Sequence, residues 1–163
     1  MNEEDFRNLQ TIIDLHMANP DTEIKTFTVL GEDGKETGDK VMAVVAPDGT
    51  KLEPMLTSDS AKLNYMYECI QPDGRGNLII DGIEEDAENL QVIINLCVEN
   101  PGSQIFTIDL NGEDGLPNGE RAICVVDENE QILSPMFKSH PLKIDYLYQA
   151  IINDEDGNLV VAL

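Results

Sequence analysis

The feature that most constrains this chain is a close similarity between its two halves. Residues 8–20 read NLQTIIDLHMANP, and 81 positions later residues 89–101 read NLQVIINLCVENP. Aligning residues 8–81 with residues 89–162 needs no gap and gives 29 identical positions out of 74. This period is longer than the roughly 20–50 residues of solenoid repeats, so the sequence predicts two copies of one small folding unit.

Both copies show the same succession of hydrophobic patterns. A helix with one apolar face comes first and stops at Asn19-Pro20 or Asn100-Pro101, because the residue before proline is pushed out of the helical conformation. Three β-rich runs follow, and a second helix begins at Ser58 or Ser139, each placed as an N-cap. The strands are predicted over 24–30, 41–46, 51–56 and 77–80 in the first copy and over 105–110, 122–127, 132–137 and 158–161 in the second.

The predicted fold is therefore α+β, with two tandem α-β-β-β-α-β units, 1–82 and 83–163. Each unit is expected to be a small antiparallel sheet packed with two helices. Because only residues 84–88 separate the copies, we expect the halves to pack together about a pseudo-twofold axis. The protein would then be a monomer with internal pseudo-symmetry, or a dimer.

The charge balance restricts the partners of this chain. It has 32 acidic and 10 basic residues, which gives a formal net charge of -22. Such a charge opposes direct binding to DNA, RNA or anionic lipid and favours a basic protein partner. No apolar run approaches the ~20 residues of a membrane helix, and the N-terminus lacks the basic and apolar start of a secretory signal. We therefore expect a cytoplasmic protein that does not contact a membrane.

No pattern typical of an enzyme, a cofactor site or a metal site is present. The only histidines, His16 and His140, align with Cys97 and Asp59, so the copies share no histidine. His16 lies on the apolar face of the first helix and is predicted to pack in the core. A serine nucleophile needs a histidine and an acid beside it, and no such set is indicated. The sequence favours a protein without catalytic residues, metal or cofactor; an acid- or metal-dependent hydrolase is the alternative, because acids are abundant.

Two acidic segments and the cysteines have simple structural explanations. Residues 109–113 and 154–158 resemble fragments of calcium loops, but both lack the twelve-residue pattern with its closing glutamate. Hairpin turns are predicted for both. Cys69, Cys97 and Cys124 form no CxxC pair and are expected to be reduced, structural thiols.

The candidate binding residues are acidic side chains of the second copy and one pair of tyrosines. Residues 83–163 contain 16 acids against 3 bases, so the primary contact with a basic partner is placed there. The predicted contact residues are Glu113, Asp114, Glu120, Asp127, Glu128 and Glu130. Tyr65 and Tyr146 lie off the apolar stripe, beside Tyr67 and Tyr148, which are predicted to be buried. Tyr65 and Tyr146 belong either to the edge of the core or to an exposed contact surface.

Residues 40–58, KVMAVVAPDGTKLEPMLTS, are followed by a predicted helix and resemble the SseB N-terminal family. In that family a strand, an Asp-Gly turn and a second strand ending in a P-x-F-T-S-like motif lead into a helix. The matching residues are Pro54, Thr57 and Ser58, and again Pro135, Phe137 and Ser139, with Leu56 and Lys138 departing from the motif. Residues 76–82 correspond to the strand that closes the family's domain. The resemblance covers about half of each copy and implies a non-enzymatic regulatory or secretion-associated module.

Together these features predict a non-enzymatic acidic binding protein. Its most concrete form is a nucleic-acid mimic that inhibits a basic nuclease or defence complex, as phage anti-defence and immunity proteins do. An SseB-like module and a hydrolase are the alternatives. A further interpretation is that the acids only keep a structural module soluble.

Overall fold

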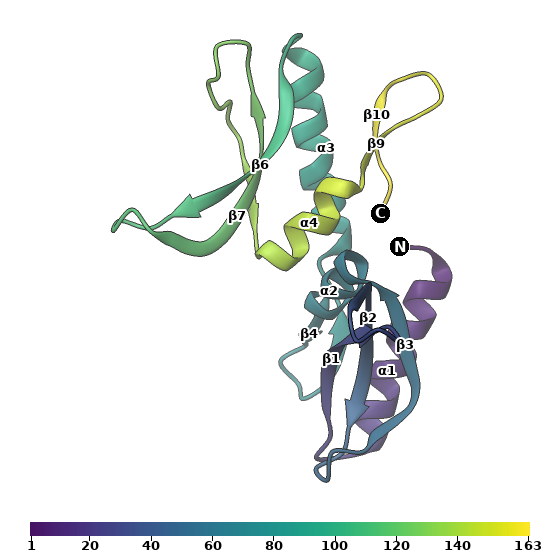
Figure 1. The fold of residues 1–163 in the computed structure, drawn as a ribbon. Helices are drawn as coiled ribbons and strands as arrows, with labels where there is room; N and C mark the ends of the chain where they lie inside the picture. The colour runs from purple at the N-terminus through teal and green to yellow at the C-terminus, as the bar shows by residue number, and fades with distance from the viewer. The chain divides into compact units, whose positions relative to one another are not determined.

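The computed structural model describes residues 1–163 and divides into two compact units, Met1–Asp81 and Gly82–Leu163. Each unit contains two helices and five strands, so the fold class is α+β with several small antiparallel sheets (Figure 1). None of the four helices combines the length and the apolar character that crossing a membrane requires.

In the first unit the order of elements is α-β-β-β-α-β-β. The elements are α1 (Glu3–Ala18), β1 (Glu23–Leu30), β2 (Glu36–Val45), β3 (Lys51–Asp59), α2 (Ser60–Glu68), β4 (Ile70–Pro72) and β5 (Leu78–Ile80). β1, β2 and β3 form an antiparallel sheet with β2 in the centre, and β4 pairs with β5 in a separate two-stranded sheet. β1 is therefore an edge strand.

Local side chains define both ends of α1. The Asn2 side chain accepts the backbone N–H of Asp5, and the Asp5 carboxylate accepts the backbone N–H of Asn2, both at 2.9 Å. This reciprocal pair satisfies two of the amide hydrogens that a helix N-terminus leaves free. At the other end the Asn19 side chain donates to the carbonyl of Leu15 at 2.8 Å, and Pro20 follows. The helix thus ends where the Asn-Pro pair predicts.

The core of the first unit lies between its helices and one face of the three-stranded sheet, with α1 behind the sheet in Figure 1. The buried cluster consists of Leu9 and Ile12 of α1, Met42 and Val44 of β2, Leu56 of β3, and Leu63 and Met66 of α2. Ile70 of β4 and Ile80 of β5 pack against this cluster. The small hairpin thereby helps to remove apolar surface from water, which is the main favourable contribution to folding.

The second unit has the same order of elements. They are α3 (Ile83–Glu99), β6 (Gln104–Asn111), β7 (Pro117–Val126), β8 (Phe137–Ser139), α4 (Pro141–Gln149), β9 (Ile151–Asn153) and β10 (Leu159–Val161). β7 is the central strand of the antiparallel sheet β6-β7-β8, and β9 pairs with β10. The fully buried side chains of this unit include Leu90, Ile93, Ile123, Ile144 and Leu147.

The fold differs from the sequence prediction by one extra strand in each unit. Ile70 and Ile151, which the apolar spacing assigns to the second helix, belong to β4 and β9 and pair with Ile80 and Val161. Three residues after a helix carry too little periodicity to distinguish another helical turn from a strand. Only the pairing with a segment farther along the chain decides between the two.

The N-caps of the second helices are also shifted by one residue. Ser58 and Ser139 still pair with β2 and β7, so the strands continue through them. The caps are Asp59, whose carboxylate accepts the N–H of Lys62 at 3.0 Å, and His140, whose Nδ1 accepts the N–H of Leu142 at 3.2 Å. The predicted capping by Ser58 and Ser139 is therefore wrong.

The third strand of the second unit is shorter than predicted. Of residues 132–137, only Phe137 belongs to β8, and Ile132 forms an isolated bridge with Val126. Regular pairing resumes only at Phe137. Proline alone does not explain the difference, because the aligned Pro54 lies within the longer β3. In contrast, β2 and β7 begin earlier than predicted, at Glu36 and Pro117.

Candidate functional site

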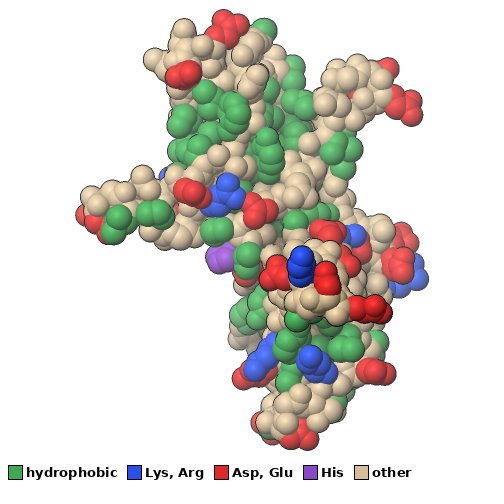
Figure 2. All heavy atoms as spheres, viewed as in Figure 1, with side chains coloured by type: hydrophobic (Ala, Val, Ile, Leu, Met, Phe, Trp, Pro, Cys, Tyr) green, Lys and Arg blue, Asp and Glu red, His purple; other side chains and the backbone are tan.

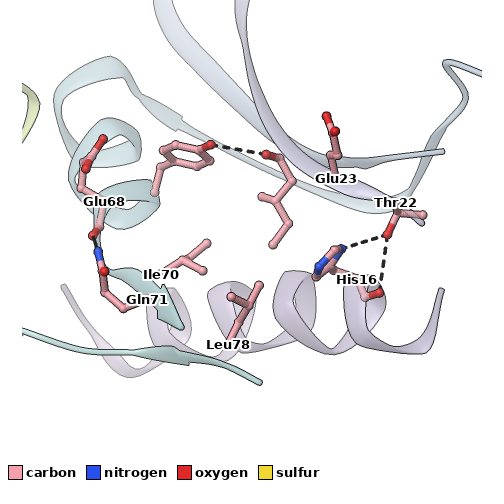
Figure 3. Close-up of a pocket in the computed structure, with 9 residues that line it drawn as sticks. His16, Thr22, Glu23, Glu68, Ile70, Gln71 and Leu78 are labelled. Atoms are coloured by element: carbon pink, nitrogen blue, oxygen red, sulfur yellow. Dashed lines mark hydrogen bonds between the residues drawn. The ribbon is translucent and has the colours of Figure 1, made fainter. Parts of the chain in front are cut away.

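The first unit contains an open pocket of about 460 Å³ between β1, the end of α2 and the β4–β5 hairpin. Its lining residues are His16, Thr22, Glu23, Ile24, Tyr67, Glu68, Ile70, Gln71 and Leu78. Figure 3 shows Ile70 and Leu78 on its apolar side, with His16 entering from α1 and Glu23 from β1. The pocket thus combines apolar surface with two carboxylates and one imidazole.

A pocket of about 430 Å³ occupies the corresponding place in the second unit. It is lined by Cys97, Ser103, Gln104, Ile105, Tyr148, Gln149, Ile151 and Leu159, and every one of these aligns with a residue of the first pocket. The chemistry differs, because Glu23 and Glu68 are replaced by glutamines and His16 by cysteine. The first pocket is therefore anionic, and the second is neutral.

His16 lies in the wall of this pocket and not in the core. Its Nδ1 is 2.9 Å from the hydroxyl of Thr22, which in turn donates its hydrogen to the carbonyl of Asn19 at 2.7 Å. The tautomer of His16 decides which of the two groups donates in this contact. The other ring nitrogen faces the pocket (Figure 3). Predicted core packing of His16 is wrong, because its ring contacts the Thr22 hydroxyl in the pocket wall.

The second unit has a hydroxyl group at the aligned position, and it also binds a carbonyl of the loop after the helix. Ser103 donates to the carbonyl of Asn100 at 2.6 Å, and its oxygen lies 3.6 Å from the sulfur of Cys97. Thr22 and Ser103 thus both fix the loop that follows the first helix of their unit. The side chain beside the hydroxyl is the imidazole of His16 in the first unit and the thiol of Cys97 in the second.

Tyr67 and Tyr148 lie at the edges of the two sheets. Their hydroxyls donate to the carbonyls of Ile24 at 3.5 Å and Ile105 at 3.3 Å. Both rings are partly exposed, at 38% and 40%, so their predicted burial is wrong. A tyrosine at such an edge packs its ring on apolar surface while its hydroxyl reaches a polar partner.

Tyr65 and Tyr146, the two tyrosines predicted as contact residues, have less accessible surface. Tyr65 is buried and Tyr146 is half-buried. Of the two predicted locations, the edge of the core describes their burial better than an exposed contact surface does.

One ion pair joins the two helices of each unit. Lys62 contacts Asp5 at 2.7 Å, and Lys143 contacts Asp86 at 2.9 Å, with all four side chains largely shielded from water. Burial would raise the pKa of Asp5, but hydrogen bonds from Lys62 and from the Asn2 backbone, with the nearby positive charges, hold that pKa below its usual value. The two halves of the sequence have the same acid and the same lysine at these aligned positions, which is a pattern from which the pairs can be inferred.

The six predicted acidic contact residues do not form one patch. Glu113 and Asp114 lie in the β6–β7 turn with Glu120 close to them in β7, whereas the others lie in the turn after β7. The ten residues of β7 span about 33 Å, so the two groups occupy opposite ends of the sheet. In Figure 1 the β6–β7 hairpin extends away from the helices of its unit.

Two of the six acids have a structural role within their turns. Asp114 accepts the N–H of Leu116 at 3.0 Å, and Asp127 accepts those of Asn129 and Gln131 at 2.8 and 2.9 Å. These Asx-type bonds stabilise the turns. The remaining four, Glu113, Glu120, Glu128 and Glu130, are exposed and are the better candidates for contact with a partner.

The segments that resemble calcium loops have defined structural roles. Residues 154–158 form the predicted turn between β9 and β10, with the Asp154 carboxylate accepting the N–H groups of Asp156 and Asn158 at 2.9 Å. Asp109 instead lies within β6 and forms an ion pair with Arg121 at 3.0 Å. No group of three or more His, Cys, Asp or Glu side chains could hold a metal ion.

None of the three cysteines forms a disulfide in the structure. Cys69 and Cys124 are buried, and burial raises the pKa of the Cys124 thiol. Cys97 is half-buried in the wall of the second pocket.

No family model, curated protein or solved structure matches this chain. A function can therefore be inferred only from the pockets, charges and strand edges of the molecule itself.

Proposed function

We propose that this protein is a non-enzymatic acidic binding protein whose partner is a basic protein. The carrying observation is that the exposed charges of the second unit are almost all negative. All but five of the 32 acidic side chains of the chain are exposed. Of the three basic residues after Gly82, Arg121 and Lys143 are held in ion pairs with acids of the same unit, which leaves Lys138 as the exposed cation without one.

The most specific form of this proposal is mimicry of a nucleic acid. A groove that attracts phosphates also attracts a surface with this density of carboxylates. β7, which links the two acidic turns, has an extended length of about 33 Å, which is close to the ~34 Å of one turn of B-DNA. An inhibitor of a nuclease or defence complex would thereby occupy two phosphate-binding positions of the same groove.

A pull-down from host lysate over a range of salt concentrations tests this function. We expect a basic nucleic-acid-binding protein to be captured at low salt, released at high salt and displaced by added DNA or RNA. The double variant Glu113→Gln/Glu120→Gln should weaken capture at least tenfold. The matched control in the first unit is Glu32→Gln/Asp39→Asn, which changes aligned positions and should weaken capture less. A partner that binds equally at all salt concentrations would contradict the proposal.

We also propose that the two units are copies of one α+β unit. The pockets at aligned positions, the two helix-joining ion pairs and the common order of elements support this interpretation. Duplication gives one chain two similar units. The surface of one unit can then change while that of the other unit is retained.

A further inference from the structure

We propose that the partner docks on the free edge of β6 by adding an extended, basic segment to the sheet as a new strand. The charge of the segment rests on the proposed function above. The strand addition itself rests on the backbone geometry of β6 and on its differences from β1.

The backbone of β6 presents unpaired groups on the side away from β7. The N–H of Leu133 donates to the carbonyl of Val125, so Val125 faces β8 and its neighbour Cys124 faces β6. Cys124 is paired with Phe106. The next residue of β6, Thr107, therefore directs both its N–H and its carbonyl outward.

The same alternation places Ile105 and Asp109 with Thr107 on the outward side. The Ile105 carbonyl accepts the Tyr148 hydroxyl at 3.3 Å, which agrees with this direction. The other outward backbone groups of these residues have no hydrogen-bond partner in the structure. They form the alternating row of donors and acceptors to which an extended peptide binds when it adds to a sheet.

The edge of the first sheet has lysine side chains on or near it, and the edge of the second sheet has none. On the outer face of the first sheet, Lys51 lies 4.1 Å from the centre of the Phe27 ring, and Lys25 lies on β1 itself. Lysine near an edge opposes pairing with another chain. The aligned residues in the second unit are Ile132 and Phe106, which are 49% and 44% exposed. Figure 2 accordingly shows basic side chains over the first sheet and a broad hydrophobic area on the second unit.

Charge complementarity selects the occupant of this edge. Asp109 lies on β6, and Glu113 and Asp114 lie in the turn at its end, whereas the exposed Lys138 lies on β8 at the opposite edge of the sheet. A segment that alternates basic and apolar residues fits both the acids and the exposed ring of Phe106. The second pocket lies at the start of this edge and offers space for one further side chain. A second copy of this chain would bring two strongly acidic surfaces together and is disfavoured.

The test uses the whole chain and three ten-residue peptides. The first alternates lysine and valine, the second has the same sequence with alternate backbone amides methylated, and the third has glutamate in place of lysine. We expect the first peptide to bind with at least tenfold higher affinity than the other two, measured by fluorescence anisotropy. It should also slow the amide hydrogen exchange of Thr107 and Asp109.

Two variants locate the binding. Thr107→Pro removes one outward N–H without removing a bond to β7, a position that tolerates proline on an edge strand. Because the Thr107 hydroxyl also accepts a bond from Arg121 at 2.8 Å, Thr107→Val is the control that loses only the hydroxyl. We expect Thr107→Pro to lose at least tenfold in affinity. Thr107→Val and the aligned Thr26→Pro in the first unit should bind the first peptide with unchanged affinity.

Each other result contradicts a separate claim. If the methylated peptide binds equally well, strand addition is contradicted but the proposal of a basic partner is not. This comparison uses no variant, so misfolding of Thr107→Pro would not affect it. Equal binding of the glutamate peptide overturns the basic partner and leaves strand addition standing. Binding by none of the peptides overturns strand addition. Dimerisation that protects Thr107 without peptide assigns the edge to a second copy and overturns the proposed occupant.

Discussion

The two units place similar pockets at aligned positions but differ in the chemistry of the surfaces around them. The first pocket contains Glu23, Glu68 and an imidazole, and the second has glutamines and a thiol at the same positions. The outer face of the first sheet carries lysines, whereas that of the second is apolar. Residues that fill the core or join helices are similar in the two halves, and so are the apolar residues that line the pockets, whereas the charged and ionisable lining residues differ. Two units with the same order of elements therefore carry pockets of different charge.

The largest effect is expected from the cores, which should respond alike. Leu9 and Leu90 are both fully buried, so Leu9→Ala and Leu90→Ala should each destabilise their unit by about 3 kcal/mol. Amide hydrogen exchange measures the two units separately. The exposed neighbours Gln10 and Gln91 provide alanine controls with little effect. If the losses in unfolding free energy caused by the two leucine substitutions differ by more than about 1 kcal/mol, the two cores are not equally packed.

The pockets can be compared through cysteine labelling. Cys97 should react with a thiol reagent about a hundredfold faster than the buried Cys69 and Cys124, which need local opening of the structure. His16→Cys places a thiol at the aligned position in the first pocket and should give a second fast reaction. If that thiol instead reacted as slowly as the buried ones, the two pockets would not be equally open.

The helix-joining ion pairs should differ slightly in strength. Lys62→Met and Lys143→Met each remove the ammonium partner of a shielded aspartate and should cost about 2 kcal/mol in urea denaturation. The cost should be larger for Lys143, because the side chain of Asp86 is 7% exposed and that of Asp5 is 13% exposed. Arg7→Gln, which removes an exposed pair with Glu3, is the control and should change nothing measurable. A smaller loss for Lys143→Met than for Lys62→Met would reverse this ranking.

The smallest expected effect is a dependence on pH in the first unit. The pKa of Asp5 is lower when folded than its ordinary 3.8, so its ionised form stabilises the native state above about pH 4. This contribution is lost as the pH falls through the folded pKa. The stability difference between the native chain and Asp5→Asn should therefore be larger at pH 7 than at pH 3, as measured by urea denaturation. The same difference at both pH values would argue against a stabilising ionised Asp5.

Local sequence was sufficient for the features that depend on near neighbours. The ends of α1 and α3 follow from Asn-Pro pairs, and the turn at 154–158 follows from an aspartate that accepts nearby backbone N–H groups. Residues 40–58, which resemble the SseB N-terminal family, form most of β2, a turn and most of β3 before α2. Membership of that family stays a prediction.

Features that depend on distant pairing could not be inferred in this way. Ser58 continues β3 because Lys40 lies opposite it, and Ile70 starts β4 because Ile80 lies opposite it. The first pocket draws its lining from five elements and from the last residue of the loop before β1, so no short sequence motif predicts it. His16 shares the spacing of core residues, yet its ring reaches the hydroxyl of Thr22 at the pocket wall. The sequence feature that could have pointed to this pocket is the comparison of the two halves, because aligned residues of the two pockets differ in charge.

The apolar outer face of the second sheet has a consequence for the colloidal behaviour of the protein. At neutral pH a net charge of -22 keeps the chains apart in solution. Near the sequence pI of about 4.1 this repulsion vanishes, while Phe106 and Ile132 remain exposed beside an open strand edge. The chain should therefore be least soluble near that pH. Repulsion between the acidic chains thus opposes the aggregation that this exposed apolar surface would otherwise favour.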